Sequence, residues 1–339
     1  MPFKVLVPDA HMRDLDIERS VSGDAIEYLV YDELDPNAIP DAVWNDCDAV
    51  LIWHRMRLNA DAVAKLHKCR LIVRVGVGFD NVDTAACRAR GIPVANVPNY
   101  GTTEVADHAL AMMLYIVRGL GTYEARMKAD PVTGFVAEDV PTVRRLRKTT
   151  FGAIGMGRIG TAIARRAAAF DMNIVYFDPY LPEGHDLSLG FERVRSLKAL
   201  LERSDVVSLH VPLSDATRRM MGAAEFATMK KGSILINIAR GGLVDIDALY
   251  DALYSGHLTA AGLDVLPQEP PVSRPKLVEA WRTNADWLAG RLILTPHAAF
   301  YSESAYEDMR TFSAEILMDY LVEGTLRNNV NPGWNSKAA

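Results

Sequence analysis

Three side chains capable of acid–base and ionic chemistry follow three separate apolar runs in the second half of the chain. Arg240 comes shortly after SILINI, Glu269 shortly after AAGLDV, and His297 shortly after LILT. Each run is typical of a buried strand. Open parallel sheets bind their ligands in a crevice beyond the carboxyl ends of the strands. Singly, the three residues are typical of a surface arginine, a loop glutamate and a loop histidine. Their joint placement predicts one catalytic edge of a sheet.

The chemistry of this set follows from its functional groups. Near neutral pH, His297 can give or take a proton, and a carboxylate such as that of Glu269 favours its charged form and fixes its tautomer. Arg240 can clamp a substrate carboxylate with two parallel hydrogen bonds and polarise the adjacent carbonyl. This set predicts reduction of a 2-keto acid with His297 as proton donor. In reverse, His297 accepts the proton of a 2-hydroxy acid.

A glycine-rich stretch, FGAIGMGRIG, supplies the cofactor side of this prediction. Gly155, Gly157 and Gly160 form GxGxxG after an apolar strand and before a helix-like segment, as a dinucleotide-binding turn requires. The amino end of that helix offers unpaired N–H groups to phosphates, and Arg158 can add a charge.

Asp178 ends the next apolar run, close to the roughly 20-residue distance expected for a ribose-binding acid. Its carboxylate suits two free ribose hydroxyls and repels a 2′-phosphate. No Arg or Lys lies between Asn173 and Glu183 to offset that repulsion. The sequence therefore predicts NAD as cofactor, with NADH preferred over NADPH. The stretch VRVGVGFDN has Asn81 where a third glycine is needed, and we interpret it as a turn with exposed N–H groups.

The rest of the chain alternates short strands with helices, which predicts parallel sheets with crossover helices. The expected strands are at 3–7, 49–53, 71–75, 94–96, 150–154, 173–177, 206–211, 233–238, 260–265 and 292–295. The expected helices include 61–67, 84–90, one long helix over 103–128, and a last helix over 302–322. The fold class is α/β, with two Rossmann-like doubly wound parallel-sheet domains, the larger binding NAD. Residues 1–100 plus 301–339 form the expected discontinuous substrate domain, and residues 101–300 the dinucleotide-binding domain.

Composition narrows the class of protein. The 339 residues are 49% hydrophobic with net charge −6, which argues against a nucleic-acid or anionic-membrane binder. The three cysteines lack CxxC spacing, so we expect free thiols and no metal site. The longest apolar run, 109–117, is too short to span a bilayer, and the first residues read as a strand rather than a signal peptide. A cytoplasmic protein is expected.

With these motifs in place, the chain resembles the D-2-hydroxyacid dehydrogenase family. The resemblance covers most of residues 45–325 through GMGRIG, ARGGLVD, GLDVLPQEPP and TPHAAFYSE, and VGVGFDNVDTAACRARGIPVANVP is similar to its N-terminal signature. FDPYL, PHAAF and YSE resemble its C-terminal-binding protein branch in particular. The family also includes formate dehydrogenases, in which glutamine replaces the glutamate. Glu269 argues against that group.

The resemblance implies catalytic roles for Arg240, Glu269 and His297, a place for Asp264 near the nicotinamide carboxamide, and a homodimer formed through the cofactor domain. The expected cofactor-binding residues are Gly155, Gly157, Arg158, Ile159, Gly160, Asp178, Val211, Pro212, Thr217, Ile238, Ala239, Arg240, Asp264 and His297. The expected substrate-binding residues are Val77, Gly78, Arg240, His297, His54, Tyr100 and Phe300.

Two features leave the substrate open. Phe300 stands where the C-terminal-binding proteins have a pocket tryptophan, and the stretch 272–291 is longer than in many members. The resemblance also leaves a second function open, an NAD(H)-sensing, corepressor-like binding protein with vestigial catalysis. The intact Arg240, Glu269 and His297 favour the enzyme.

Overall fold

The computed structural model describes residues 1–10 and 14–333, and it divides into two units. The first unit comprises Met1–Gly101 together with the chain from Ser302 onward. The second unit is Thr102–Tyr301.

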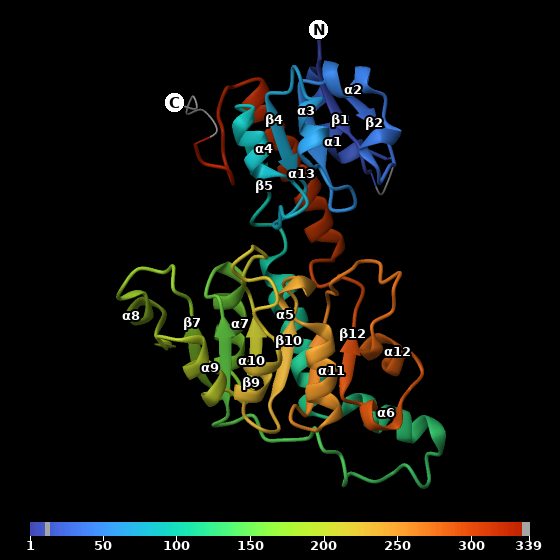
Figure 1. Ribbon diagram of the computed structural model, residues 1–339, viewed down its shortest axis with the longest axis vertical. Helices are drawn as coiled ribbons and strands as arrows, with labels where there is room; N and C mark the ends of the chain where they lie inside the picture. The colour runs from blue at the N-terminus through green and yellow to red at the C-terminus, as the bar shows by residue number, and fades with distance from the viewer. Residues whose placement is uncertain (11–13, 334–339) are drawn as a thin grey trace. The chain divides into compact units, whose positions relative to one another are not determined.

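The first unit is a parallel sheet in the order β2-β1-β3-β4-β5. Its strands are β1 (Phe3–Val7), β2 (Ile26–Val30), β3 (Ala49–Ile52), β4 (Leu71–Arg74) and β5 (Val94–Asn96) (Figure 1). Its α-helices are α1 (Asp16–Ser22), α2 (Asp41–Asp46), α3 (Ala60–Ala64), α4 (Thr84–Ala89) and α13 (Glu303–Leu321). Every residue of β3 and β4 is buried, as expected for strands covered on both faces.

The second unit is a larger parallel sheet in the order β12-β11-β10-β9-β6-β7-β8. Its strands are β6 (Thr150–Ile154), β7 (Asn173–Phe177), β8 (Glu192–Arg193), β9 (Val206–Leu209), β10 (Ile234–Asn237), β11 (Ala260–Leu263) and β12 (Leu292–Leu294). The chain progresses outward from β6 in one direction and from β9 in the other. This topological switch point is where open α/β sheets form their ligand crevice.

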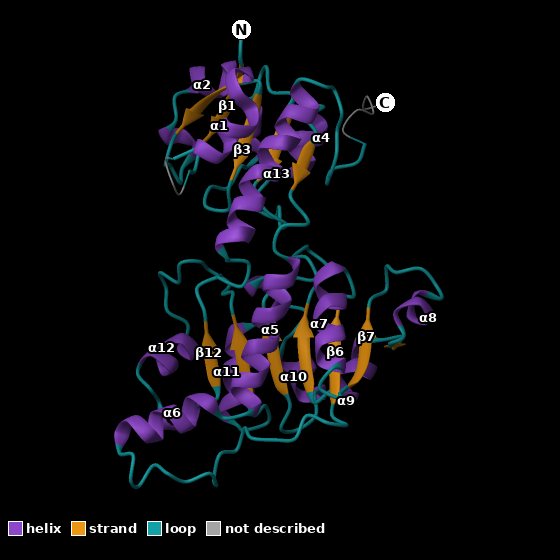
Figure 2. Ribbon diagram, turned by 180° about the vertical axis from the view of Figure 1, so that it is seen from behind, coloured by secondary structure: helices purple, strands orange, loops and turns teal. Residues whose placement is uncertain are grey.

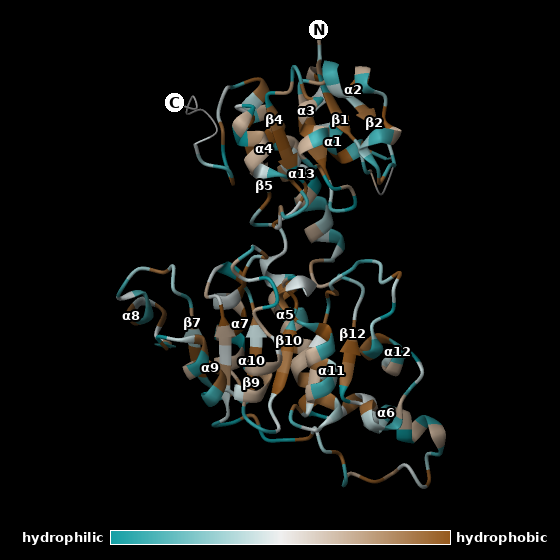
Figure 3. Ribbon diagram, in the orientation of Figure 1, coloured by the Kyte–Doolittle hydropathy of each residue, from teal (hydrophilic) through white to brown (hydrophobic). Residues whose placement is uncertain are grey.

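Helices cover both faces of the larger sheet. One face carries α5 (Thr102–Val117) and α7 (Arg158–Ala168), seen in front in Figure 2. The opposite face carries α9 (Leu197–Arg203), α10 (Ala223–Thr228) and α11 (Ile246–Tyr254), seen in front in Figure 1. The remaining helices are α6 (Leu120–Ala129), α8 (His185–Leu189) and α12 (Lys276–Arg282). In Figure 3 strands such as β4, β10 and β12 are predominantly apolar, and the helices are mixed.

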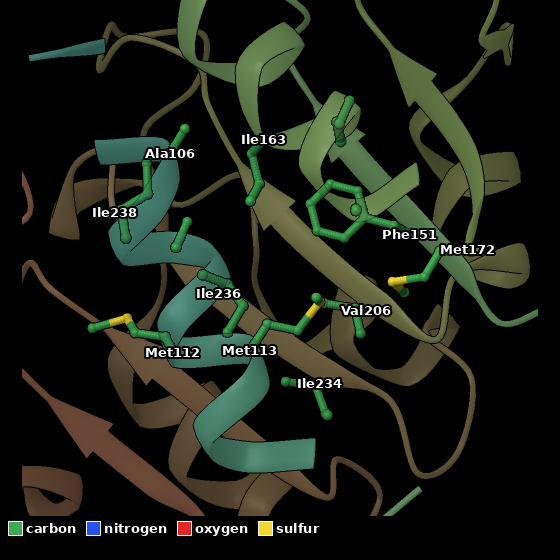
Figure 4. Close-up of a cluster of buried hydrophobic side chains, with 14 of the residues drawn as sticks. Ala106, Met112, Met113, Phe151, Ile163, Met172, Val206, Ile234, Ile236 and Ile238 are labelled. Carbon is green, nitrogen blue, oxygen red and sulfur yellow. The ribbon is translucent and has the colours of Figure 1, made fainter. Parts of the chain in front are cut away.

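The core beneath α5 shows how the sheet is held. Met112 and Met113 lie among Val206, Ile234 and Ile236 from neighbouring strands (Figure 4). All five side chains are almost completely buried. Apolar burial of this kind contributes roughly 1.5–3 kcal/mol per large side chain. It fixes α5 and the strands whose ends carry the candidate site.

Two parallel α/β sheets confirm the expected fold class, but several elements differ from the prediction. The single helix over 103–128 is wrong, because α5 ends at Val117 and α6 begins at Leu120. Gly119 separates them in the left-handed region, at φ 63°, where Val140 and Val143 leave no room for a Cβ. The strands β2 and β8 were not predicted, since the half-exposed IEYLV and the two-residue β8 lack a buried apolar run.

Candidate active site

The candidate residues of the second unit share one edge of its sheet. Gly155 follows β6, Asp178 follows β7, Arg240 follows β10, Glu269 follows β11, and His297 follows β12. Because these strands are parallel, their carboxyl ends all lie at this edge.

The glycine turn fits a dinucleotide. Gly155 has φ 89°, and a Cβ at Gly160 would lie 2.2 Å from the Gly155 carbonyl, so these two glycines allow the turn and its close packing. A Cβ at Gly157 would meet nothing within 4 Å, and no side chain caps α7 there. The first N–H groups of α7 are thus open to an anion. Arg158 is exposed at this helix end, and Ile159 packs on the core.

Asp178 is held against this turn. Its Oδ2 accepts from the Met156 N–H at 3.0 Å, and its Oδ1 accepts from the Tyr180 N–H at 3.0 Å. A cation absent from the neighbouring sequence also comes close, because Arg193 of β8 donates to the Asp178 carbonyl at 2.7 Å. The guanidinium binds the backbone of this loop, and the carboxylate stays directed to the glycine turn.

Glu269 and His297 form a direct pair. His297 Nδ1 lies 2.7 Å from Glu269 Oε2. An ionised carboxylate only accepts hydrogen bonds, so Nδ1 carries the proton. The other ring nitrogen, Nε2, is then a base in the neutral ring and an acid in the charged ring. The pair can therefore both give and take a proton at Nε2.

The surroundings keep Glu269 ionised. Partial burial raises the pKa of Glu269, whereas the hydrogen bond and charge of His297 lower it. The Leu266 N–H, 2.8 Å from Oε1, and the charge of Arg240 act in the same direction. The net pKa lies below the usual value for glutamate, so the carboxylate is charged throughout the neutral range.

Arg240 is held by the end of β10. Its Nη1 donates to the Ala239 carbonyl at 2.8 Å. Buried Asn237 donates to the Arg240 carbonyl at 2.9 Å and accepts from the Ala239 N–H at 3.1 Å. Sequence reasoning missed Asn237, although a polar residue closing an apolar strand was the available signal.

Asp264, expected near the nicotinamide carboxamide, lies just after β11 and bonds to the turn that carries His297. Its side chain is 0% exposed. Its oxygens accept from the Thr295 hydroxyl at 2.5 Å, the Ala298 N–H at 2.8 Å and the Ala299 N–H at 2.9 Å. Its backbone carbonyl accepts from the His297 N–H at 2.7 Å. These hydrogen bonds hold the turn that carries His297.

The remaining cofactor candidates line the loop after β9 and the end of β10. Val211 packs partly on the core and Pro212 is exposed. The Thr217 hydroxyl donates to the Pro212 carbonyl at 2.7 Å and accepts from the Ser214 N–H at 2.8 Å, so it closes this loop. Ile238 is buried in the core and can offer only its backbone.

The substrate candidates divide between the units. Val77 and Gly78 are half-exposed in the turn after β4, His54 is exposed, and Tyr100 is buried. Phe300, in the second unit, lies edge-on to His297 with 6.4 Å between ring centroids.

Two charged residues of the first unit were missed by sequence reasoning. Arg74 lies beneath the 76–78 turn, where its Nη1 would be 1.8 Å from a Cβ at Gly76. Buried Asp9 accepts from the N–H groups of Trp53, Arg55 and Met56 at 2.9–3.0 Å. It therefore shapes the loop that presents His54. An acid directly after an apolar strand was the signal available in the sequence.

Residues 1–10 and 14–333 contain no group of three or more His, Cys, Asp or Glu side chains arranged to hold a metal ion. No helix in this part of the chain is long and apolar enough to cross a membrane. Cys47, Cys69 and Cys87 are free and buried in the first unit.

Comparison with known proteins identifies the family. The model of the NAD binding domain of D-isomer specific 2-hydroxyacid dehydrogenases matches residues 110–299, more than half of the chain. The chain belongs to the D-isomer specific 2-hydroxyacid dehydrogenase family. The residues that match the family model include the glycine turn and Arg240, Glu269 and His297.

The matches to two curated relatives extend over most of this chain. It is 36% identical over 285 residues to the D-3-phosphoglycerate dehydrogenase of Methanocaldococcus jannaschii, covering 84% of this chain and 52% of that protein. It is 31% identical over 311 residues to C-terminal-binding protein 1 of Caenorhabditis elegans, covering 89% of this chain and 41% of that protein. The chain thus spans about half the length of these relatives. The identity to the phosphoglycerate dehydrogenase is higher than the identity to the C-terminal-binding protein, so the branch of the family to which this chain belongs stays open.

A solved structure agrees over the whole length. The NADPH-dependent glyoxylate/hydroxypyruvate reductase of Sinorhizobium meliloti, in complex with NADP and malonate, has a TM-score of 0.86 and 27% sequence identity. The match covers 100% of each chain. A protein of similar structure is therefore NADPH-dependent.

Proposed function

We propose that this chain is an NAD-dependent oxidoreductase that interconverts a 2-keto acid and a D-2-hydroxy acid. The observation that carries the proposal is the 2.7 Å bond between His297 Nδ1 and Glu269 Oε2, at the sheet edge that also presents Arg240 and the glycine turn. The charge of Glu269 both fixes the tautomer of His297 and favours its protonation, as a proton donor requires.

Within this proposal each side chain has one task. A nicotinamide dinucleotide, when bound, supplies or accepts the hydride. His297 donates a proton from Nε2 to the substrate oxygen during reduction and accepts it during oxidation. Glu269 stabilises the charged imidazole. The guanidinium of Arg240 binds the substrate carboxylate and polarises the carbonyl beside it.

The glycine turn and Asp178 support a preference for NADH over NADPH. The open amino end of α7 suits a pyrophosphate, and the carboxylate beside it suits ribose hydroxyls. Because the structurally similar S. meliloti reductase is NADPH-dependent, the preference has to be tested by measurement with both cofactors. The contacts proposed for Ile159, Val211, Pro212, Thr217, Ile238 and Ala239 complete this binding set.

The acyl group of the substrate belongs to the same proposal. The first unit is proposed as the substrate domain, with the N–H groups of Val77 and Gly78 binding the carboxylate. His54, Tyr100 and Phe300 are proposed to select the acyl group. The named relatives act on different acids, so a substrate panel is needed to choose among them.

The direct test is NADH consumption by the full chain with glyoxylate, hydroxypyruvate, pyruvate and longer 2-keto acids. We expect turnover with at least one of them. His297→Asn should lower kcat by roughly 10²–10⁴, the range for loss of a general acid, without changing the Kd for NADH. Near-native turnover by this variant would exclude His297 as the proton donor.

A second function has one specific observation in its favour, the similarity to C-terminal-binding protein 1. Wild-type protein that binds NADH tightly but reduces none of these acids would favour an NAD(H)-sensing binding protein. The same assay therefore separates the two candidates.

We also propose a homodimer formed through the cofactor unit and a cytoplasmic location. The dimer is supported by exposed apolar side chains along α6 and the segment after it, including Leu120, Val132 and Phe135. Exposed apolar surface of this kind marks interaction sites.

A further inference from the structure

A second histidine, His108, contacts the turn of residues 295–299, which carries His297. It belongs to the first turns of α5, on the same unit as His297. Its Nε2 lies 3.0 Å from the Thr295 hydroxyl oxygen and 3.8 Å from Asp264 Oδ1. Thr295 immediately follows β12, two residues before His297.

The directions of these hydrogen bonds follow from donor and acceptor capacity. Asp264 already accepts from the N–H groups of Ala298 and Ala299, so it acts as an acceptor toward Thr295 as well. The single proton of the Thr295 hydroxyl is therefore used on Asp264, at 2.5 Å. The hydroxyl can then only accept from His108, whose Nε2 must carry a proton.

This chain of hydrogen bonds ends at the backbone that carries His297. His297 has φ 54°, in the left-handed region that non-glycine residues seldom adopt. The N–H of His297 binds the Asp264 carbonyl, and the next two N–H groups bind the Asp264 carboxylate. A change in the orientation of this carboxylate therefore changes the position of the imidazole.

We infer that His108 is a positioning residue for the turn 295–299: its Nε2–H holds the Thr295 hydroxyl, which orients the Asp264 carboxylate, which fixes the backbone of His297. The inference rests on the proposed function for the meaning of that geometry. It assigns α5, which packs on one face of the larger sheet, a part in holding the proton donor.

Three variants test it. His108→Leu and Thr295→Val each break the chain, whereas His108→Gln keeps an N–H donor the same number of bonds from the backbone. His257→Leu is the matched control, because His257 Nε2 lies 2.9 Å from the Met229 carbonyl, on residues outside the strand ends that carry the site.

We expect His108→Leu and Thr295→Val to lower kcat by about ten- to a hundredfold, as small misplacements of catalytic groups do, with the Kd for NADH unchanged. His108→Gln should restore most of the turnover, and His257→Leu should retain it. Equal turnover for His108→Leu and wild type would overturn the inference, as would loss of activity in His108→Gln equal to that in His108→Leu.

Amide hydrogen exchange gives a readout that does not need catalysis. Exchange at Ala298 and Ala299 should accelerate in His108→Leu and Thr295→Val and stay slow in His108→Gln. A lower melting temperature without faster exchange at these amides would mean that His108 only stabilises the unit, and would overturn the inference. If the wild type reduced no keto acid, the proposed function would fail, and the exchange rates would still decide this inference.

Discussion

At the scale of single residues, the proposed chemistry rests on the pair of Glu269 and His297. The carboxylate holds Nδ1 in its protonated state and adds a negative charge beside the ring. The reduced pKa of Glu269 means that this charge persists well below neutral pH and is lost only as the pH falls through that lowered value. The proton-transfer properties of the ring therefore depend on a carboxylate that does not itself titrate near pH 7.

Replacing that charge should move the pH profile. Glu269→Gln keeps an oxygen acceptor but removes the charge that stabilises the imidazolium. The donating form is then lost at a lower pH, so keto-acid reduction should fade at a lower pH than in wild type. The measurement is kcat/KM against pH, with Glu279→Gln, an exposed acid on α12, as the control. Superimposable profiles for Glu269→Gln and wild type would show that the pair has no role in proton transfer.

The cofactor preference is a second property at this scale. Asp178→Ala removes the carboxylate held beside the glycine turn, so NADH binding should weaken by about 1–3 kcal/mol and use of NADPH should improve. Kd and kcat/KM for both cofactors give the comparison, with Asp186→Ala on α8 as a control in the same segment. Equal use of NADH and NADPH by the wild type would contradict the proposed role of Asp178.

At the scale of elements, α13 is fixed to α1 by a buried ion pair. Arg310 donates from Nε and Nη2 to the Glu18 carboxylate at 2.6–3.1 Å, and from Nη2 to the Asp14 carbonyl at 2.8 Å. The side chains are 4% and 0% exposed. The guanidinium also lies over the Tyr306 ring, 5.7 Å from its centre. This contact joins the last helix to the first one.

Breaking that pair should destabilise the first unit. Glu18→Gln removes the buried counter-charge of the guanidinium and leaves only the exposed Asp14 carboxylate, 3.9 Å away, which costs about 3–5 kcal/mol. Glu124→Gln, which removes one partner of the exposed Lys128–Glu124 pair, should cost less than about 1 kcal/mol. Calorimetry of the unfolding of both variants measures the difference. Similar unfolding temperatures for the two would show that the buried pair has no special weight.

At the scale of the whole molecule, α6 and the residues after it concentrate exposed apolar side chains. Val132 and Phe135 are 83% and 82% exposed, and Leu120 is 52% exposed. The left-handed Gly119 lies between the end of α5 at Val117 and the start of α6 at Leu120. We propose this surface for contact with a second copy of the chain.

A charge on this surface should prevent assembly. Val132→Asp combined with Phe135→Asp should convert a dimer to a monomer, because a charge is costly to bury in an apolar contact. Phe170→Asp, at a less exposed apolar residue after α7, is the control and should leave the dimer intact. Light scattering after size-exclusion chromatography gives the mass. A monomeric wild type would contradict the proposed dimer.

The sequence by itself determined the features that depend on local pattern. Short β-branched runs at 3–7, 94–96, 150–154 and 173–177 are strands with those bounds in the structure. The glycine spacing and the placement of Arg240, Glu269 and His297 after such runs were enough to predict one sheet edge. Strand burial and turn geometry act over a few neighbouring residues, so their signals are present in the linear chain.

The tertiary structure alone decided what depends on partners distant in sequence. His108 meets Thr295, Arg193 reaches the Asp178 loop, and Glu18 binds Arg310 across most of the chain. The separation of α5 from α6 at Gly119 also became visible only in the tertiary structure, as did the hydrogen bonds of Asp264 to the turn 295–299. The physical reason is that a buried polar group is satisfied by whichever donor or acceptor the packing brings near, and packing brings together residues whose separation in sequence has no period to detect.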